Sequence, residues 1–153
     1  RDTRDRTPLH LACRVPNGTE MVRMLLEHPG FDAALSLTPD EDGRTPLHLA
    51  AANEKSGLES ARLVLGIPGV FANNLQGANT VFDVRHQIRF LNARDNDNAT
   101  ALHFAGSNTN GLEIMRILLS IPGIDVHVRD NEGQTPLDSV CASNNQEAAR
   151  LFS

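Results

Sequence analysis

The chain has 153 residues, of which 40% are hydrophobic and 22% are charged, a balance typical of a soluble globular protein and unlike that of a disordered or membrane-spanning one. Its formal net charge of −5 argues against nucleic acid as a partner, because nucleic-acid-binding proteins usually present a basic surface. Trp and Tyr are absent and only six Phe are present, so the predicted core is built from aliphatic side chains.

The first predicted element is a short helix that begins after Thr7, and the tetrad that opens it recurs along the chain. Thr followed by Pro favours a helix start, because Pro at the first helical position gives up no hydrogen bond that it could have made. The tetrad Thr-Pro-Leu-His stands at residues 7–10 and 45–48, and in variant form, with Ala101 and with Asp138, at 100–103 and 135–138.

A second predicted helix follows each tetrad at a nearly constant distance. It starts near a glutamate and carries apolar residues at spacings of three and four, which predicts one buried stripe. An arginine three residues after the glutamate can pair with it. Pro-Gly pairs at 29–30, 68–69 and 122–123 are predicted to end these helices, with Gly in the left-handed conformation. The helix-starting glutamates are Glu20, Glu59, Glu113 and Glu147.

A polar turn precedes each tetrad. The residue two positions before each threonine is Asp5, Gly43, Asn98 or Gly133. These residue types tolerate a positive φ best, so the pattern predicts a left-handed residue in each turn. One helical pair of this length cannot bury its own apolar face, whereas stacked pairs can.

These tetrads, the small residues after them and the Asp-x-x-Gly-x-Thr segments at 40–45 and 130–135 resemble ankyrin repeats. The resemblance implies an all-α solenoid of four helix-turn-helix units with projecting β-hairpin-like turns and a concave face that binds protein. We expect a single domain over 1–153, with repeats at about 2–39, 40–94, 95–129 and 130–153. The second repeat holds an insertion at about 72–91.

The histidines and cysteines are predicted to be structural. His10, His48 and His103 share one repeat position, and the resemblance implies that each is buried and hydrogen-bonded near its own threonine. Stacked layers hold these side chains too far apart to share a metal ion, so we expect neither a metal site nor a cofactor. Cys13 and Cys141 lie three layers apart, on the order of 25–30 Å, so both are expected to be core thiols without a disulfide.

The insertion combines an Asn- and Gly-rich first half with an apolar and basic second half. Loops of this length are usually functional or disordered. Phe82, Arg85, Ile88 and Arg89 therefore either contact a partner or, in the case of Phe82 and Ile88, pack back on the repeats. A weaker alternative is an anionic ligand held by Arg85, His86 and Arg89.

No nucleophile elbow, P-loop, dinucleotide turn or paired carboxylate motif is present, so we expect no enzymatic activity. The predicted function is a protein-interaction or scaffold module that binds through its turn tips, its concave face and the insertion. The chain begins with Arg1 instead of Met, which keeps open a regulatory or targeting segment of a larger enzyme. Besides the four insertion residues, the predicted contacts are Arg4, Arg6, Arg14, Glu41, Asp42, Arg44, Asn53, Asn96, Asp97, Asn108, Asn131, Glu132 and Gln134.

No signal peptide and no run of eighteen apolar residues is present in the sequence. We therefore expect an intracellular protein, cytoplasmic or nuclear, that does not enter a membrane. Its expected partner is another protein, with nucleic acid disfavoured, and the chain is expected to be monomeric on its own.

Overall fold

The computed structural model describes residues 1–66 and 88–153. Helices alternate along the chain in pairs, and the second helix is the longer one in the first three pairs but the shorter one in the last. The first helices are α1 (Pro8–Arg14), α3 (Pro46–Ala52), α6 (Ala101–Ser107) and α8 (Pro136–Ala142). The second helices are α2 (Thr19–Glu27), α4 (Gly57–Leu65), α7 (Leu112–Ser120) and α9 (Gln146–Ala149). The described residues also contain two 3-10 helices, η1 (Ala33–Ser36) and η2 (Arg150–Phe152), and a helical turn over 88–91.

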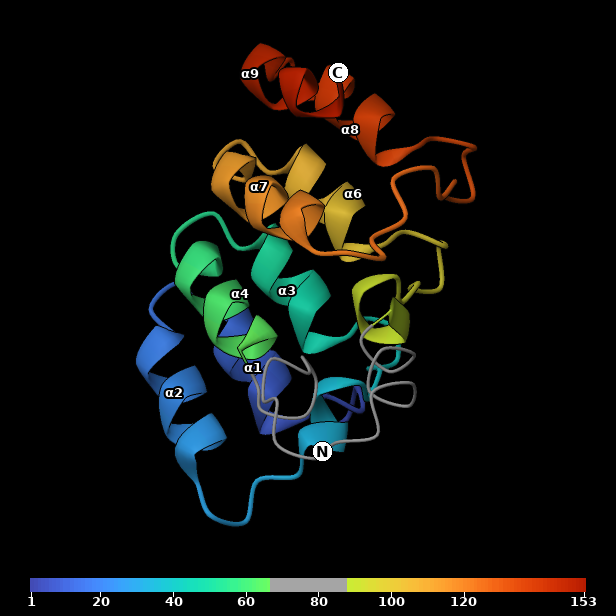
Figure 1. Cartoon of the computed structure of the whole chain (residues 1–153). Coiled ribbons are helices and arrows are strands. Elements are labelled where there is room, and N and C mark those ends of the chain that lie inside the picture. The colour runs from blue at the N-terminus through green and yellow to red at the C-terminus, as the bar shows by residue number, and fades with distance from the viewer. Residues whose placement is uncertain (67–87) are drawn as a thin grey trace.

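The helical pairs stack into two parallel rows, and the turns between repeats project to one side (Figure 1). In one row α1 packs on α3, α3 on α6 and α6 on α8. In the other row α2 packs on α4, α4 on α7 and α7 on α9. No strand occurs in residues 1–66 or 88–153, so the predicted all-α solenoid of helical pairs is confirmed for this part of the chain.

The helix starts follow from the tetrads. Each threonine is in extended conformation and caps the helix that follows, and Pro occupies the first helical position in α1, α3 and α8. The helix ends differ in part from the prediction. Of the two Pro-Gly glycines in the described residues, Gly123 has a positive φ (94°) and Gly30 does not, whereas Gly69 lies outside these residues. His28 and Ile121, which precede the prolines, are extended and already end α2 and α7, because a residue before Pro avoids the helical region.

Among the described residues, the fully buried core is aliphatic except for one aromatic side chain. Leu47, Leu102 and Leu118 are fully buried, and alanines at 12, 50, 51 and 105 let neighbouring layers approach closely. Phe90 is 1% exposed and joins this core from the helical turn at 88–91. The last residues of the predicted insertion are therefore part of the core, whereas residues 67–87 lie outside the described residues.

Ion pairs support the second helices. The predicted pairing of glutamate with the arginine three residues later is present in α2, α4 and α7, at 3.8, 3.0 and 3.2 Å. In the last repeat Glu147 lies 3.9 Å from Arg116 of the preceding repeat. That pair therefore links two neighbouring repeats within the row of second helices.

Both cysteines are free, but only one lies in the core. Cys13 is fully buried, and burial raises the pKa of its thiol to about 12, so it remains protonated and unreactive. Cys141 is exposed, which corrects the prediction that both are core thiols. It occupies the position equivalent to Cys13, Ala51 and Gly106, which the next layer covers in the earlier repeats, whereas no described layer follows α8 and α9.

Candidate functional site

Each projecting turn is built around one aspartate. The Oδ1 of Asp40 accepts hydrogen bonds from the amides of Asp42 and Arg44, at 3.0 and 2.9 Å. Asp2, Asp95 and Asp130 make the same two contacts in their own turns. The predicted left-handed residues are confirmed, with φ of 55° at residue 5, 77° at 43, 59° at 98 and 77° at 133.

The turn tips are tied to one another. The amide of Glu41 donates to the carbonyl of Arg4, and the same backbone bond joins each later pair of tips, at 2.9–3.0 Å. The side chain of Asn96 donates to the carbonyl of Glu41 at 2.9 Å, and that of Asn131 donates to the carbonyl of Asn96 at 3.3 Å. Asn96 and Asn131 are exposed, as expected of contact residues, but they also hold adjacent tips in register.

The repeated histidines connect neighbouring repeats. The Nδ1 atoms of His10, His48 and His103 accept a hydrogen bond from the backbone amide of their own threonine, at 3.1 Å each. Their Nε2 atoms lie 2.9–3.1 Å from a backbone carbonyl of the next turn. Because a carbonyl only accepts, Nε2 carries the proton and the ring is neutral. The predicted buried structural role is confirmed, and the link to the next repeat extends it.

Because these histidines are buried in the neutral form, we expect the chain to lose stability in mildly acidic solution. Burial lowers the pKa of His10 and His48 below its ordinary value of 6.5. Below pH 6.5 the unfolded chain therefore binds more protons than the folded chain, and the free energy of unfolding decreases as the pH falls. The slope is at most about 1.4 kcal/mol per pH unit for each histidine.

Urea unfolding followed by circular dichroism at pH 7.5, 6.5 and 5.5 measures this slope. The expectation is contradicted if the free energy of unfolding stays constant or increases as the pH falls from 7.5 to 5.5. Carboxylates act in a lower window: the pKa of Asp2 is lowered to about 2, mainly by its hydrogen bond from Arg6, so its contribution is lost only below pH 4.

An acidic hollow lies between the tips of the later repeats and the helix α6. Four carboxylates line it around the half-buried ring of Phe104, and for none of them does an ion pair occur among the described residues. Arg44 is the cation at its edge, 6.0 Å from the centre of the Phe104 ring and 3.3 Å from Asp42. The hollow is therefore net negative. Its lining residues are Arg44, Asp95, Asp97, Ala99, Phe104, Asp130, Asn131 and Glu132.

A second hollow, at the tips of the first two repeats, contains most of the predicted basic residues. Arg4 lies 3.6 Å from Glu41, and Arg6 lies 2.7 Å from Asp2. Arg14 stands at the end of α1 without an ion pair to any described residue. Internal pairing thus neutralises most of the positive charge that the sequence places in the first repeat. The hollow is lined by Arg4, Arg6, Arg14, Asp40, Asp42, Arg44 and Leu49.

Two asparagines after the first helices hold neighbouring repeats together. The side chain of Asn53 donates to the carbonyls of Cys13 and Val15, at 3.0 Å each. Asn108 is 4% exposed and donates to the carbonyl of Ala51 at 2.9 Å. Its interior position leaves no side-chain surface for a partner, so we leave Asn108 out of the proposed binding surface.

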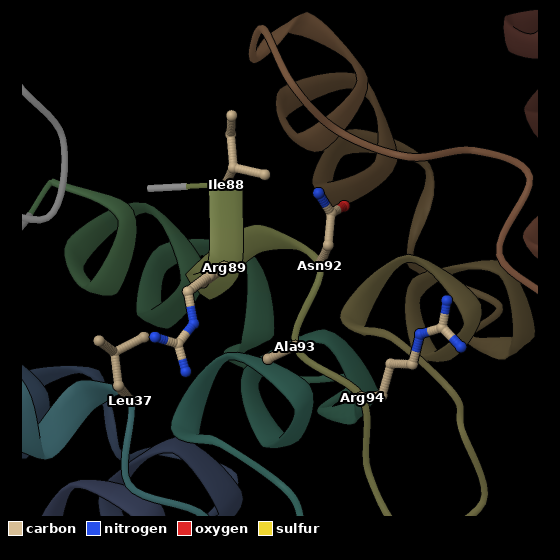
Figure 2. Close-up of a pocket in the computed structure, with 6 residues that line it drawn as sticks. All are labelled: Leu37, Ile88, Arg89, Asn92, Ala93 and Arg94. Carbon is tan, nitrogen blue, oxygen red and sulfur yellow. The ribbon is translucent and has the colours of Figure 1, made fainter. Parts of the chain in front are cut away.

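The end of the insertion borders a third hollow, lined by Leu37, Ile88, Arg89, Asn92, Ala93 and Arg94 (Figure 2). Arg89 extends toward Leu37, whereas Arg94 extends away on the other side of the backbone (Figure 2). The two guanidinium groups therefore do not converge on one anion. Asn92 is engaged by Gly123 and Asp125 of the third repeat, at 2.8 Å each.

Of the predicted insertion contacts, Ile88 is 38% exposed and Arg89 is exposed. Phe82 and Arg85, like His86, lie outside the described residues. Within residues 1–66 and 88–153 no group of His, Cys, Asp or Glu side chains is arranged to hold a metal ion. None of the helices in the same ranges is sufficiently long and hydrophobic to traverse a lipid bilayer.

Comparison with known proteins agrees with this architecture. A family model described as ankyrin repeats (three copies) matches residues 1–75 and 69–153. A putative ankyrin repeat protein of Rickettsia bellii is 37% identical over 68 residues, covering 42% of this chain and 69% of that protein. Rabankyrin-5 of Mus musculus is 35% identical over 112 residues, covering 72% of this chain. The human transient receptor potential cation channel subfamily A member 1 is 30% identical over 130 residues, covering 84% of this chain.

The fold and its repeated tetrads define a solenoid of stacked helical pairs. The chain belongs to the ankyrin-repeat family. It spans only 8% of the length of rabankyrin-5 and 10% of that of the channel protein. Ankyrin repeats are generally protein–protein interaction modules and are typically not enzymes.

The acidic hollow includes residues that the sequence reasoning did not single out. In the sequence Asp95 and Asp130 are interpreted only as turn residues, because both occupy the repeated aspartate position at the start of a turn. Phe104 stands where the first two repeats have Leu11 and Leu49. The last repeat has Ser139 there, so Phe104 is the one aromatic residue at this repeat position, and this difference is the signal that could have indicated the hollow.

Proposed function

We propose that the chain binds a partner protein through the surface formed by its turn tips and first helices, and that the acidic hollow receives a basic side chain of that partner. The observation that carries the proposal is the group of four carboxylates around Phe104, which form no ion pair with any described residue. A positively charged group placed there gains electrostatic energy, and its aliphatic stem can pack against the ring.

Glu41, Asp42 and Gln134 are predicted contacts that belong to the turns bordering the hollow. Glu41 and Asp42 belong to the tip that precedes it, and the carbonyl of Gln134 is bound by His103 at its far end. Arg14 offers a cation that no described carboxylate neutralises. A partner with basic groups toward the last two repeats and an acidic group near Arg14 would therefore match the surface.

Further parts of the proposal concern the setting of the protein. We infer an intracellular location, because both thiols are free and disulfides are rare in reducing compartments. The chain is expected to be a monomer when its partner is absent. The anionic-ligand alternative rests on Arg85 and His86, which lie outside the described residues, together with Arg89, and neither it nor an enzymatic role is part of the proposal.

The test is affinity capture from a cell extract with three versions of the full chain. Asp97→Asn together with Glu132→Gln removes two charges from the hollow while leaving the Asp95 and Asp130 turn caps intact. Glu27→Gln together with Glu54→Gln removes the same charge from exposed sites outside the hollow. All three versions must first show the same helical circular dichroism and melting temperature.

We expect the natural chain and the variant with Glu27→Gln and Glu54→Gln to retain the same partner protein equally. The variant with Asp97→Asn and Glu132→Gln should bind that partner at least about tenfold more weakly. Its affinity for the natural chain should also fall with rising salt concentration. Equal retention by all three versions argues against the hollow as the recognition site. Any shortening of the insertion in a companion experiment must spare Phe90 and Leu91, which are core residues.

A further inference from the structure

The first helical pair carries an apolar hollow on α1 and α2. It is lined by Pro8, Leu11, Met21, Met24 and Leu25. Met24 is 66% exposed and Met21 is 49% exposed, more than any other large hydrophobic side chain in the described residues. Exposed clusters of this kind on a soluble protein usually mark an interaction surface.

The repeat itself shows what covers these positions elsewhere. Met21 follows the glutamate near the start of the second helix, and its counterparts are 0–1% exposed. They are buried because α4, α7 and α9 each pack on the second helix of the preceding repeat. The counterparts are Ser60, Ile114 and Ala148.

The same contrast holds at the start of the first helix. Pro8 is exposed, whereas its counterparts in the later tetrads are buried. There, each of α3, α6 and α8 packs on the first helix before it. The counterparts of Pro8 are Pro46, Ala101 and Pro136. A terminal repeat that ends a solenoid normally has a polar outer face, which this repeat lacks.

We propose that the α1–α2 face is a stacking surface for one further helical pair of the ankyrin type, joined to the chain through the turn at residues 2–6. That turn has the aspartate cap of the later turns. The carbonyl of Arg6 is equivalent to those of Arg44, Ala99 and Gln134, each of which is bound by a histidine of the repeat before. The occupant therefore carries a histidine at the fourth position of its tetrad.

This requirement excludes the far end of a second copy of the chain. The last tetrad ends in Asp138, whose carboxylate is already bound to Thr135 at 2.7–2.8 Å. Stacked end to end on another copy, Asp138 would place an acceptor against the carbonyl of Arg6, and two acceptors cannot share a hydrogen bond. The last tetrad therefore lacks the histidine that bonds the next turn at the internal junctions, whereas the N-terminal turn offers the matching carbonyl.

The proposed junction would lack one hydrogen bond that the junctions between the described repeats have. Asn53, Asn108 and Ser143 reach back to carbonyls of the preceding first helix. Val15 stands at the equivalent position and is 39% exposed. Apolar packing by Val15 and the methionines, together with the histidine bond to Arg6, would hold the added pair.

The test joins a copy of residues 95–128, which contains His103, directly ahead of Arg1 of the full chain. Oxidation by dilute peroxide, read by mass spectrometry at each methionine, reports on coverage. We expect Met21 to oxidise at least tenfold more slowly in the fused chain than in the unfused chain. Met24 should be protected less, because its counterparts Leu63 and Ile117 are only half-buried. In the unfused chain Met115, which is 1% exposed, gives the oxidation rate expected of a covered methionine.

A matched fusion in which His103 of the added copy is replaced by Asp tests whether stacking requires the hydrogen bond from a histidine to the carbonyl of Arg6. It should lose most of the protection at Met21. An unchanged oxidation rate of Met21 in the first fusion overturns the proposal. The unfused chain is examined by sedimentation equilibrium, where the proposal expects a monomer. Self-association that protects Met21 would assign the face to a second copy and would equally overturn it. Neither result depends on the acidic hollow.

Discussion

Replacing His48 by Ala is expected to destabilise the chain by about 3–5 kcal/mol. The side chain is 1% exposed and its ring meets Phe104 edge to face, with centroids 5.5 Å apart. Removing it leaves a cavity and deprives the buried amide of Thr45 of its partner, and it leaves the carbonyl of Ala99 with only the hydrogen bond from the amide of Asp95. Urea unfolding at pH 7.5 measures the loss, which should appear as a lower midpoint.

The last repeat provides the control for this substitution. Asp138 makes the same contacts to its own threonine but is exposed and has no following repeat to bind among the described residues. Asp138→Ala should therefore cost only a small fraction of the His48 effect. If the two variants lose stability equally, the cap alone accounts for the histidine, and its link between repeats contributes nothing.

Replacing Gly111 by Ala is expected to cost about 3 kcal/mol. Gly111 precedes α7, with an ordinary φ of −80°, so the reason is space and not backbone conformation. A Cβ built there would overlap the carbonyl oxygen of Ala105 and lie 3.0 Å from that of Asn108. Both obstacles are backbone atoms, so the end of α6 has to move away from the start of α7. Thermal and urea unfolding of the variant would measure the cost.

Gly30 offers the matched control. It is exposed, and the nearest atoms to a Cβ there belong to the His28 side chain, at 3.3 Å, which can rotate away. Gly30→Ala should change the free energy of unfolding by less than about 0.5 kcal/mol. A cost at Gly111 as small as that at Gly30 would show that the two helices of the repeat are not held at the distance described.

The local structure of this chain could be predicted because each unit carries its own signals. Thr before Pro starts a helix wherever it occurs, and the residues at 5, 43, 98 and 133 adopt a positive φ because their turns require it. The stack then follows, since no single pair can bury its apolar stripe. The helix ends were predicted less well: the residues before Pro29 and Pro122 already end α2 and α7, so the glycines do not set these ends, and Gly30 has no positive φ.

What the sequence by itself determined was the number and kind of helical units, their turns and the structural role of the repeated histidines. Only the tertiary structure decided which surfaces remain open. Cys13 and Cys141 share one repeat position, as do Met21 and Ile114, yet their exposure differs, because burial depends on whether another layer lies above. The tertiary structure also decides which charges are paired. Arg4 and Arg6 form ion pairs with neighbouring carboxylates, whereas carboxylates from two turns line one hollow together with the ring of Phe104. Such encounters arise from the spacing between layers, which local sequence does not encode.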